Sequence, residues 1–163
     1  MSSPFAAPSA QEHAALLAEL APLPVSGQAW PAWVKALAWL IVAALTVQIA
    51  RTLNRYAPGE IAQSPIGWTV LFCFVGLAVV AFAMQRSVTT IDEKGLTQTW
   101  IMRREVAWQD IQFAKFVPLL FSKRLVVFTR RGRPIIFQGG TQALHIAFAR
   151  ISLVYRRGGA KGR

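Results

Sequence analysis

The sequence predicts a membrane protein in which a two-helix transmembrane hairpin is followed by a small antiparallel β-sheet, or partial barrel, capped by one C-terminal helix. Two long apolar stretches, Trp33 to Ala50 and Ile66 to Met84, predict the hairpin. The net charge of +11 lies beyond them, because residues 1–85 hold three basic and three acidic side chains, whereas residues 86–163 hold fifteen and four. After residue 86 the hydrophobic period alternates as in strands, and after Gly140 it becomes helical again.

Residues 1–32 form a Pro- and Ala-rich arm that holds five of the nine prolines. Ser9 and Glu12 have the spacing of a capping box, and the apolar run from Ala14 to Leu20 follows them. This pattern predicts a short amphipathic helix. Alone it is too short to persist in water, so we expect it to lie on a bilayer surface or to dock onto a protein. Disorder is the alternative for a segment of this composition.

The two apolar stretches differ in strength. Ile66 to Met84 contains nineteen uncharged residues, which span about 28 Å as a helix and match the roughly 30 Å hydrocarbon core. In the first stretch the charge-free run, Ala36 to Ala50, has only fifteen residues. Lys35 is compatible with a span because a lysine at a helix end can snorkel to the headgroups. We expect spanning helices over about 33–50 and 66–84, within a hairpin of residues 33–85.

The connecting segment, Arg51 to Pro65, contains the helix breakers Pro58 and Gly59 and is predicted to be a short external turn. Two basic residues lie on this turn, and five lie near the span ends on the other side: Lys35, Arg86, Lys94, Arg103 and Arg104. The excess of Lys and Arg predicts that both termini are cytoplasmic. A cleaved signal peptide is not expected, since the residues before the first apolar run contain no Lys or Arg.

One face of the second apolar stretch carries mostly small residues at helical spacing, namely Thr69, Cys73, Gly76, Val80 and Ala83. Small faces let helices approach closely in lipid. We expect this face to pack against the first helix of the hairpin, and the helix of a partner protein is the alternative. Because Cys73 is the only cysteine, the chain can form no intramolecular disulfide and no cysteine-based metal site.

Residues 86–157 are predicted to form the sheet and its helix, followed by a basic tail over 158–163. Runs rich in Val, Ile, Thr, Phe and Trp predict five strands: Ser87–Ile91, Leu96–Met102, Val106–Ile111, Arg124–Arg130 and Pro134–Gln138. The turn signals Asp92-Glu93-Lys94-Gly95 and Arg130-Arg131-Gly132-Arg133 favour an antiparallel meander. The closing helix is amphipathic, and its apolar face holds Leu144, Phe148, Ile151 and Tyr155.

Four features of this region resemble the bacterial pleckstrin-homology-like (bPH) family of small membrane proteins: the segment Thr90 to Leu96, the segment Val106 to Ile111, the strand pair ending at Phe137, and the helix from Thr141. The resemblance covers Trp33 to Tyr155. It implies two transmembrane helices before a compact sheet closed by one C-terminal helix, in a chain of the bacterial inner membrane. The family has seven strands where this sequence predicts five, and residues 113–122 are the expected place of a further, irregular strand.

The sequence offers no candidate catalytic group, metal site or cofactor site. Its seven carboxylates and two histidines include no pair at metal or triad spacing, and no phosphate-binding loop or dinucleotide fingerprint occurs. Trp108 and Ile111 are predicted to be core residues, and Asp110 is predicted to cap a turn or pair with an arginine. We therefore expect a non-enzymatic protein that needs no cofactor.

Clustered basic residues are the candidate contacts with anionic lipid or with a partner protein: Arg103, Arg104, Lys123, Arg124, Arg130, Arg131, Arg133, Arg156 and Arg157. Near an anionic leaflet each contributes about 1 kcal/mol of attraction. The alternative is the general cytoplasmic excess of positive charge in membrane proteins.

Three hypotheses follow, in decreasing order of support. The first is an accessory, assembly or scaffold subunit of a larger inner-membrane protein complex. The second is a membrane-tethered module that binds anionic lipid headgroups. The third is docking to nucleic acid or the ribosome. It rests on charge alone, because the aromatic residues that would stack on bases are expected in the core of the sheet.

Overall fold

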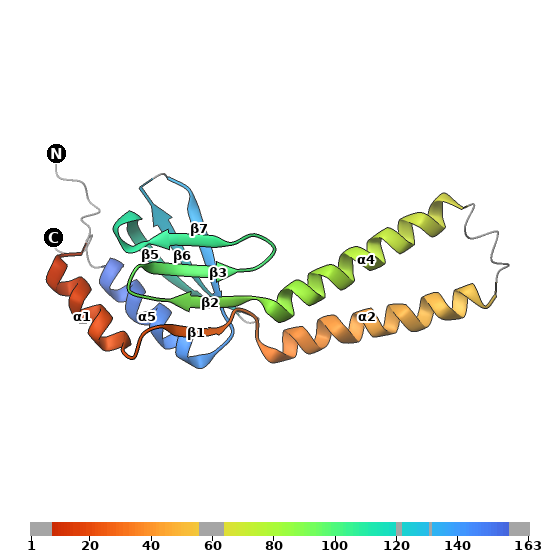
Figure 1. Cartoon of the computed structure of the whole chain (residues 1–163), viewed down its shortest axis with the longest axis horizontal. Helices are drawn as coiled ribbons and strands as arrows, with labels where there is room; N and C mark the ends of the chain where they lie inside the picture. Colours follow the sequence, from red (N-terminus) through yellow and green to blue (C-terminus); the bar gives the residue numbers. More distant parts are fainter. Residues whose placement is uncertain (1–7, 56–63, 120–121, 131, 157–163) are drawn as a thin grey trace. The chain divides into compact units, whose positions relative to one another are not determined.

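The computed structural model describes residues 8–55, 64–119, 122–130 and 132–156 (Figure 1). The chain divides into two compact units. The sheet unit comprises residues 1–31 and 86–163, and the hairpin unit comprises residues 32–85. The sequence predicts a separate arm over residues 1–32, whereas the structure groups residues 1–31 with the sheet.

The hairpin unit consists of two 22-residue helices, α2 (Ala32–Leu53) and α4 (Pro65–Arg86). Both are long and apolar enough to cross a membrane, and a helix of this length spans about 33 Å. Most of their large apolar side chains are exposed, with Phe72 reaching 82%. The prediction of two long apolar helices is confirmed, and each extends a few residues beyond its predicted bounds. Residues 56–63 of the predicted turn lie outside the described residues.

The sheet unit contains two antiparallel sheets. Sheet A has the order β1-β2-β3-β4, formed by Val25–Gln28, Val88–Ile91, Gly95–Thr99 and Arg104–Ala107. Sheet B has the order β5-β6-β7, formed by Ile111–Pro118, Lys123–Thr129 and Pro134–Gly139. A 3₁₀ turn, η1 (Trp108–Asp110), joins the two sheets, and the helices are α1 (Ala10–Leu20) and α5 (Gln142–Arg156). The predicted small antiparallel sheet and C-terminal helix are confirmed, although the structure has two sheets and does not show a barrel.

Seven strands are present among the described residues, compared with five predicted from the sequence. The first addition is β1, which contains a serine, a glycine and a glutamine and is recognisable as a strand only through its pairing with β2. The second is β5, which occupies much of the region reserved for an irregular strand. The predicted strand Val106–Ile111 is interrupted by η1, so that its two halves belong to different sheets.

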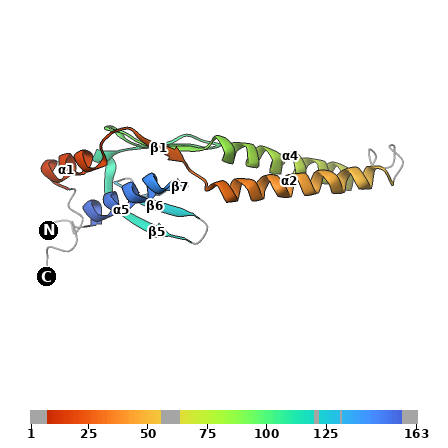
Figure 2. The ribbon, with the colours of Figure 1, turned by 90° about the horizontal axis from the view of Figure 1, so that it is seen from below.

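Helix α1 begins with the expected capping box. The Ser9 hydroxyl accepts a hydrogen bond from the Glu12 backbone N–H, and the Glu12 carboxylate accepts one from the Ser9 N–H at 2.9 Å. The helix packs against α5 of its own chain (Figure 2), where Leu16 and Leu20 are buried. Arg150 of α5 donates to the Glu19 carbonyl and pairs with the Glu19 carboxylate at 3.9 Å. Docking within the chain therefore gives this short helix the partner that it needs.

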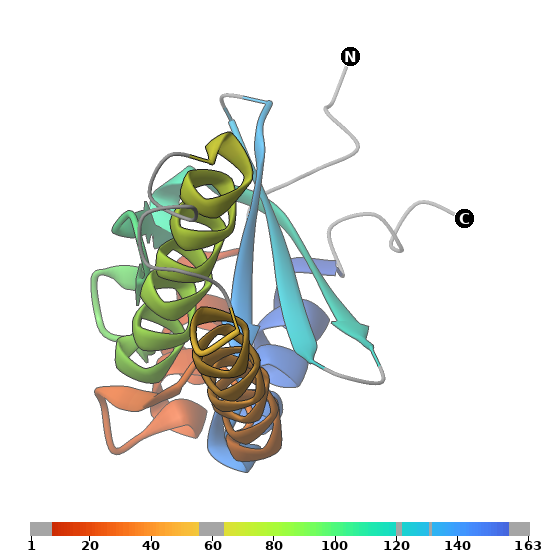
Figure 3. The same cartoon turned by 90° about the vertical axis from the view of Figure 1, so that its right-hand side faces the viewer.

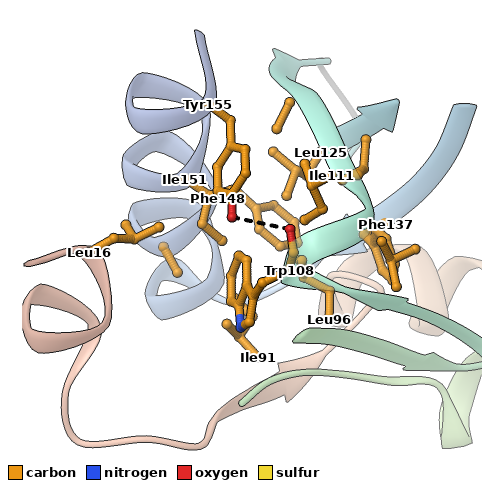
Figure 4. Packing of buried hydrophobic residues seen from close by; sticks show 14 of the residues in the cluster. Leu16, Ile91, Leu96, Trp108, Ile111, Leu125, Phe137, Phe148, Ile151 and Tyr155 are labelled. Atoms are coloured by element: carbon orange, nitrogen blue, oxygen red, sulfur yellow. Dashed lines mark hydrogen bonds between the residues drawn. The ribbon is translucent and has the colours of Figure 1, made fainter. Parts of the chain in front are cut away.

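One hydrophobic core joins both sheets and both helices of the sheet unit. Figure 4 shows Trp108 beneath the apolar face of α5, and all four residues predicted for that face are buried. The Trp108 side chain is 6% exposed, its Nε1–H donates to the Asp92 carbonyl at 2.9 Å, and its ring stacks on that of Tyr155. Trp108 and Ile111 are core residues, as predicted.

Candidate functional site

The chain leaves the sheet unit and returns to it at adjacent positions of sheet A. Strand β1 ends at Gln28 and β2 begins at Val88, and these two residues pair in register. Only residues 29–31 separate β1 from α2, and only Ser87 separates α4 from β2. The hairpin unit is thus inserted between two neighbouring strands. We call this end of the sheet unit the junction edge.

Hydrogen bonds fix both connections at the junction edge. Ser87 is buried, and its hydroxyl donates to the Thr99 carbonyl at 2.7 Å. The Thr99 hydroxyl accepts from the Val88 N–H and donates to the Val88 carbonyl, both at 3.2 Å. The Ala29 N–H donates to the Ser87 carbonyl at 3.1 Å, which ties the outgoing connection to the returning one. Each connection therefore starts from a hydrogen-bonded residue of the sheet unit.

The β3–β4 loop presents apolar side chains at the junction edge. Ile101 is 61% exposed and Met102 is 76% exposed. The base of the loop is anchored, since the Trp100 ring lies 6.0 Å from that of Trp30 and the Arg104 guanidinium lies 5.8 Å from the centre of the Trp100 ring. Arg104 also donates to the Ile136 carbonyl at 3.1 Å, which joins sheet A to sheet B. The loop therefore has a fixed base and an exposed apolar tip.

The β5–β6 connection carries a similar combination of residues. Leu119 is 45% exposed, and its N–H donates to the Ser122 carbonyl. Lys123 is exposed, and the Arg124 Nε–H donates to the Ser122 hydroxyl at 3.1 Å. These two basic residues pair across the sheet with Gly139 and Gln138.

Sheet B meets sheet A beside this connection. The Gln138 carbonyl accepts a hydrogen bond from the Thr89 hydroxyl at 2.7 Å, and the Gln138 N–H donates to the Gln98 side chain. The Gly140 N–H donates to the Gln28 carbonyl at 2.8 Å. Lys123 and Arg124 therefore belong to the same end of the sheet unit as Arg103 and Arg104.

Of the remaining candidate basic residues, Arg130 and Arg133 do not lie at the junction edge. Arg130 and Arg133 lie on the β6–β7 turn, at the opposite end of sheet B from the β5–β6 connection (Figure 3). We call this the distal end; it also holds the β2–β3 turn, η1, the start of α1 and the end of α5. Arg131 and Arg157 lie outside the described residues, and the structure gives no side-chain placement for Arg156. The nine candidates are therefore not one site.

A cleft of about 710 Å³ lies at the distal end. Its lining includes His13, Lys94, Trp108, Arg130 and Tyr155. Burial raises the pKa of the Tyr155 hydroxyl from 10.0 to about 12, and this hydroxyl lies 3.5 Å from the Trp108 carbonyl (Figure 4). The Tyr155 hydroxyl is therefore held neutral and is not a base at neutral pH.

The carboxylates and histidines of the described residues do not assemble into a group that could hold a metal ion. Asp110 is exposed, and its carbonyl accepts a hydrogen bond from the Arg130 N–H. His145 forms a hydrogen bond with the Gly139 carbonyl at 2.8 Å. Neither residue has an arrangement that activates a nucleophile or water.

On the hairpin unit, the small face lies on the exposed side of α4. Cys73 is exposed, and no heavy atom outside its own helix backbone lies within 4 Å of the position that a Cβ on Gly76 would take. The best-covered residue of α4 is Ala81, which is not on this face. The small face is therefore open to a further helix.

Comparisons of the chain with protein-family models, curated proteins and solved structures gave no match. The exposed tips Ile101, Met102 and Leu119 were not among the residues selected from the sequence. A signal for them does exist, because each apolar tip is followed within a few positions by two consecutive basic residues. The segment Leu96–Met102 was instead predicted to be a strand.

Proposed function

We propose that this chain is a non-enzymatic accessory, assembly or scaffold subunit of a bacterial inner-membrane protein complex, and that its sheet unit is a cytoplasmic pleckstrin-homology-like domain. The observation that carries the proposal is the insertion of the hairpin unit between β1 and β2 through connections of three residues and one residue. If the hairpin unit crosses a membrane, connections of this length keep the sheet unit close to the membrane surface. That suits a structural subunit better than a module that searches for soluble ligands.

The architecture of both units supports the proposal. The helices of the hairpin unit expose most of their large apolar side chains, which is unfavourable in water and favourable in lipid. The sheet unit has seven described strands in sheets of four and three, followed by one helix. Seven is the number of strands that the resemblance to the bPH family implies.

A topology experiment tests the membrane placement. We expect a reporter that is active only outside the cytoplasm to be silent when it is fused after Arg163 and active when it is inserted near Pro58, because the basic residues favour a cytoplasmic sheet unit. The reverse pattern would show that the proposed orientation is wrong.

The small face of α4 provides the test for a partner protein. In a mild-detergent purification, Gly76→Leu should release the co-purifying partner, because a bulky side chain prevents close helix approach. Gly76→Ala is the matched control and should retain the partner. Both replacements enter open space within the described residues, so neither strains the chain itself. A parent protein that is monodisperse and alone under several gentle extraction conditions would contradict the proposal.

A further inference from the structure

We propose that the junction edge docks onto anionic phospholipid headgroups. In this arrangement Ile101, Met102 and Leu119 are seated at the boundary between headgroups and acyl chains, and Arg103, Lys123 and Arg124 contact lipid phosphates. The inference rests on the proposed membrane anchorage of the hairpin unit. It adds a second, electrostatic contact between the sheet unit and the membrane.

The composition of the two loops matches the chemistry of a membrane interface. Each loop has exposed apolar residues, Ile101 and Met102 in one and Leu119 in the other, and two consecutive basic residues follow within a few positions, Arg103 and Arg104 in one and Lys123 and Arg124 in the other. Interfacial segments bury their apolar residues a few ångströms into the headgroup region, while their cations stay with the phosphates. One of these basic residues, Arg103, pairs with the Glu105 carboxylate at 3.2 Å on the surface. An exposed pair of this kind is weak and exchanges readily for a phosphate.

The short connections between the sheet unit and the hairpin unit favour a bilayer as the binding partner of the junction edge. Residues 29–31 can span at most about 11 Å when extended, and Ser87 spans less. If α2 and α4 cross a membrane, the junction edge is therefore held within reach of the headgroups. Trp30 and Trp100 lie side by side at this edge, and the Nε1–H of each is buried without a hydrogen-bond partner in the part of the chain that the structure describes. Tryptophan is enriched at membrane interfaces.

The described residues of the β6–β7 turn at the distal end lack this combination. Arg130 and Arg133 lie on this turn on either side of Gly132 with no apolar residue between them, and Glu93 lies in the same cleft as Arg130. Arg130 and Arg133 therefore provide the matched control. Arg104 is left unchanged in every variant, because it joins the two sheets through Ile136.

The test uses the full chain in vesicles, with labels at single cysteines and phospholipids that carry a quencher in the headgroup. In a Cys73→Ser background, a fluorophore at Met102→Cys should be strongly quenched in vesicles that contain phosphatidylglycerol, and one at Glu93→Cys should not. Replacing Arg103, Lys123 and Arg124 by Gln should lower the ratio of docked to undocked loops on the order of 100-fold. Replacing Arg130 and Arg133 by Gln should leave this ratio unchanged.

A label on native Cys73, combined with lipids quenched in their acyl chains, reports insertion of α4 independently. If Cys73 is not quenched, the proposed membrane anchorage itself fails. If Cys73 is quenched and Met102→Cys is not, only the docking proposal is overturned. Equal quenching of Met102→Cys in vesicles of phosphatidylcholine alone would likewise overturn recognition of anionic headgroups.

Discussion

Both the distal end and the junction edge of the sheet unit carry large apolar side chains, but the distal end buries them and the junction edge exposes them. At the distal end the aromatic rings of Trp108 and Tyr155 are buried and stack on each other, 6.1 Å apart. At the junction edge Ile101 and Met102 point outward, and backbone hydrogen bonds and Arg104 hold the edge together. The distal end therefore contributes to the stability of the fold through buried area. The junction edge leaves apolar and basic groups free for binding.

The difference follows from how many segments converge at each end. At the distal end α1, α5, η1 and the β2–β3 turn surround Trp108, so its large side chain has neighbours on several sides. At the junction edge two connections leave toward the hairpin unit, and the loops beside them have fewer elements of the sheet unit to pack against. Four variants test this contrast.

The largest effect is expected from Trp108→Ala at the distal end. The substitution removes a nearly buried ring and the hydrogen bond to the Asp92 carbonyl, and large-to-small changes of this kind cost about 3–5 kcal/mol. Urea titration of the full chain in lipid nanodiscs, followed by near-ultraviolet circular dichroism, measures the loss. The hairpin unit should still insert. An unchanged unfolding midpoint would mean that the distal end is not the stabilising end.

A smaller loss is expected from Gly140→Ala, which perturbs the junction edge. A Cβ on Gly140 would lie 2.4 Å from the Trp30 carbonyl carbon and 2.8 Å from the Gln28 oxygen. Because these are backbone atoms, β1 has to shift, at a cost of about 1–3 kcal/mol. Hydrogen exchange should accelerate in residues 25–30 and not around Trp108. Gly76→Ala, which meets no atoms within 4 Å, is the control, and equal exchange in both variants would refute the clash.

Alkaline pH should weaken the distal end selectively. Burial raises the pKa of Tyr155 to about 12, so the folded state retains its proton where the unfolded state loses it. This contribution to stability is fully present below pH 10, and it is lost as the pH rises toward 12. Unfolding midpoints of the parent and of Tyr155→Phe, measured from pH 8 to 11, should show a steeper decline for the parent. Parallel curves would argue against the buried hydroxyl as the cause.

The smallest effect on stability is expected from the double variant Ile101→Ser with Met102→Ser. Both side chains are exposed on a loop, and surface changes of this kind usually stay within about 0.5 kcal/mol. With the fluorophore moved to Leu119→Cys in the Cys73→Ser background, the same variant should abolish the quenching contact with anionic vesicles. A large loss of stability would mean that the loop tip is part of the core, and the contrast between the two ends would disappear.

The sequence was a sufficient guide where a residue pattern reflects burial directly. The apolar lengths predicted both long helices, and the spacing of Leu144, Phe148 and Ile151 predicted the buried face of α5. The capping box predicted the start of α1. These signals are local, because helical spacing and end capping involve residues three or four positions apart.

Non-local features could not be predicted from the sequence. Strand β1 is defined by its pairing with a strand that lies beyond the hairpin, and its own residues have weak strand preference. The junction edge is assembled from residues near 28, 88, 100, 123 and 139, which no sequence window contains. Ile101 and Met102 were assigned to a strand, because the sequence alone does not distinguish an exposed apolar residue from a buried one.

The insertion of the hairpin unit between β1 and β2 has a consequence for the synthesis of the chain. Strand β1 is made before the hairpin, and its partner residue at the return, Val88, follows Gln28 by 60 positions. If the hairpin crosses a membrane, β1 stays unpaired until the second helix has brought β2 back to the same side. A single crossing would leave the two strands in different compartments. Closure of sheet A would then require correct insertion, since only molecules with both crossings could pair β1 with β2.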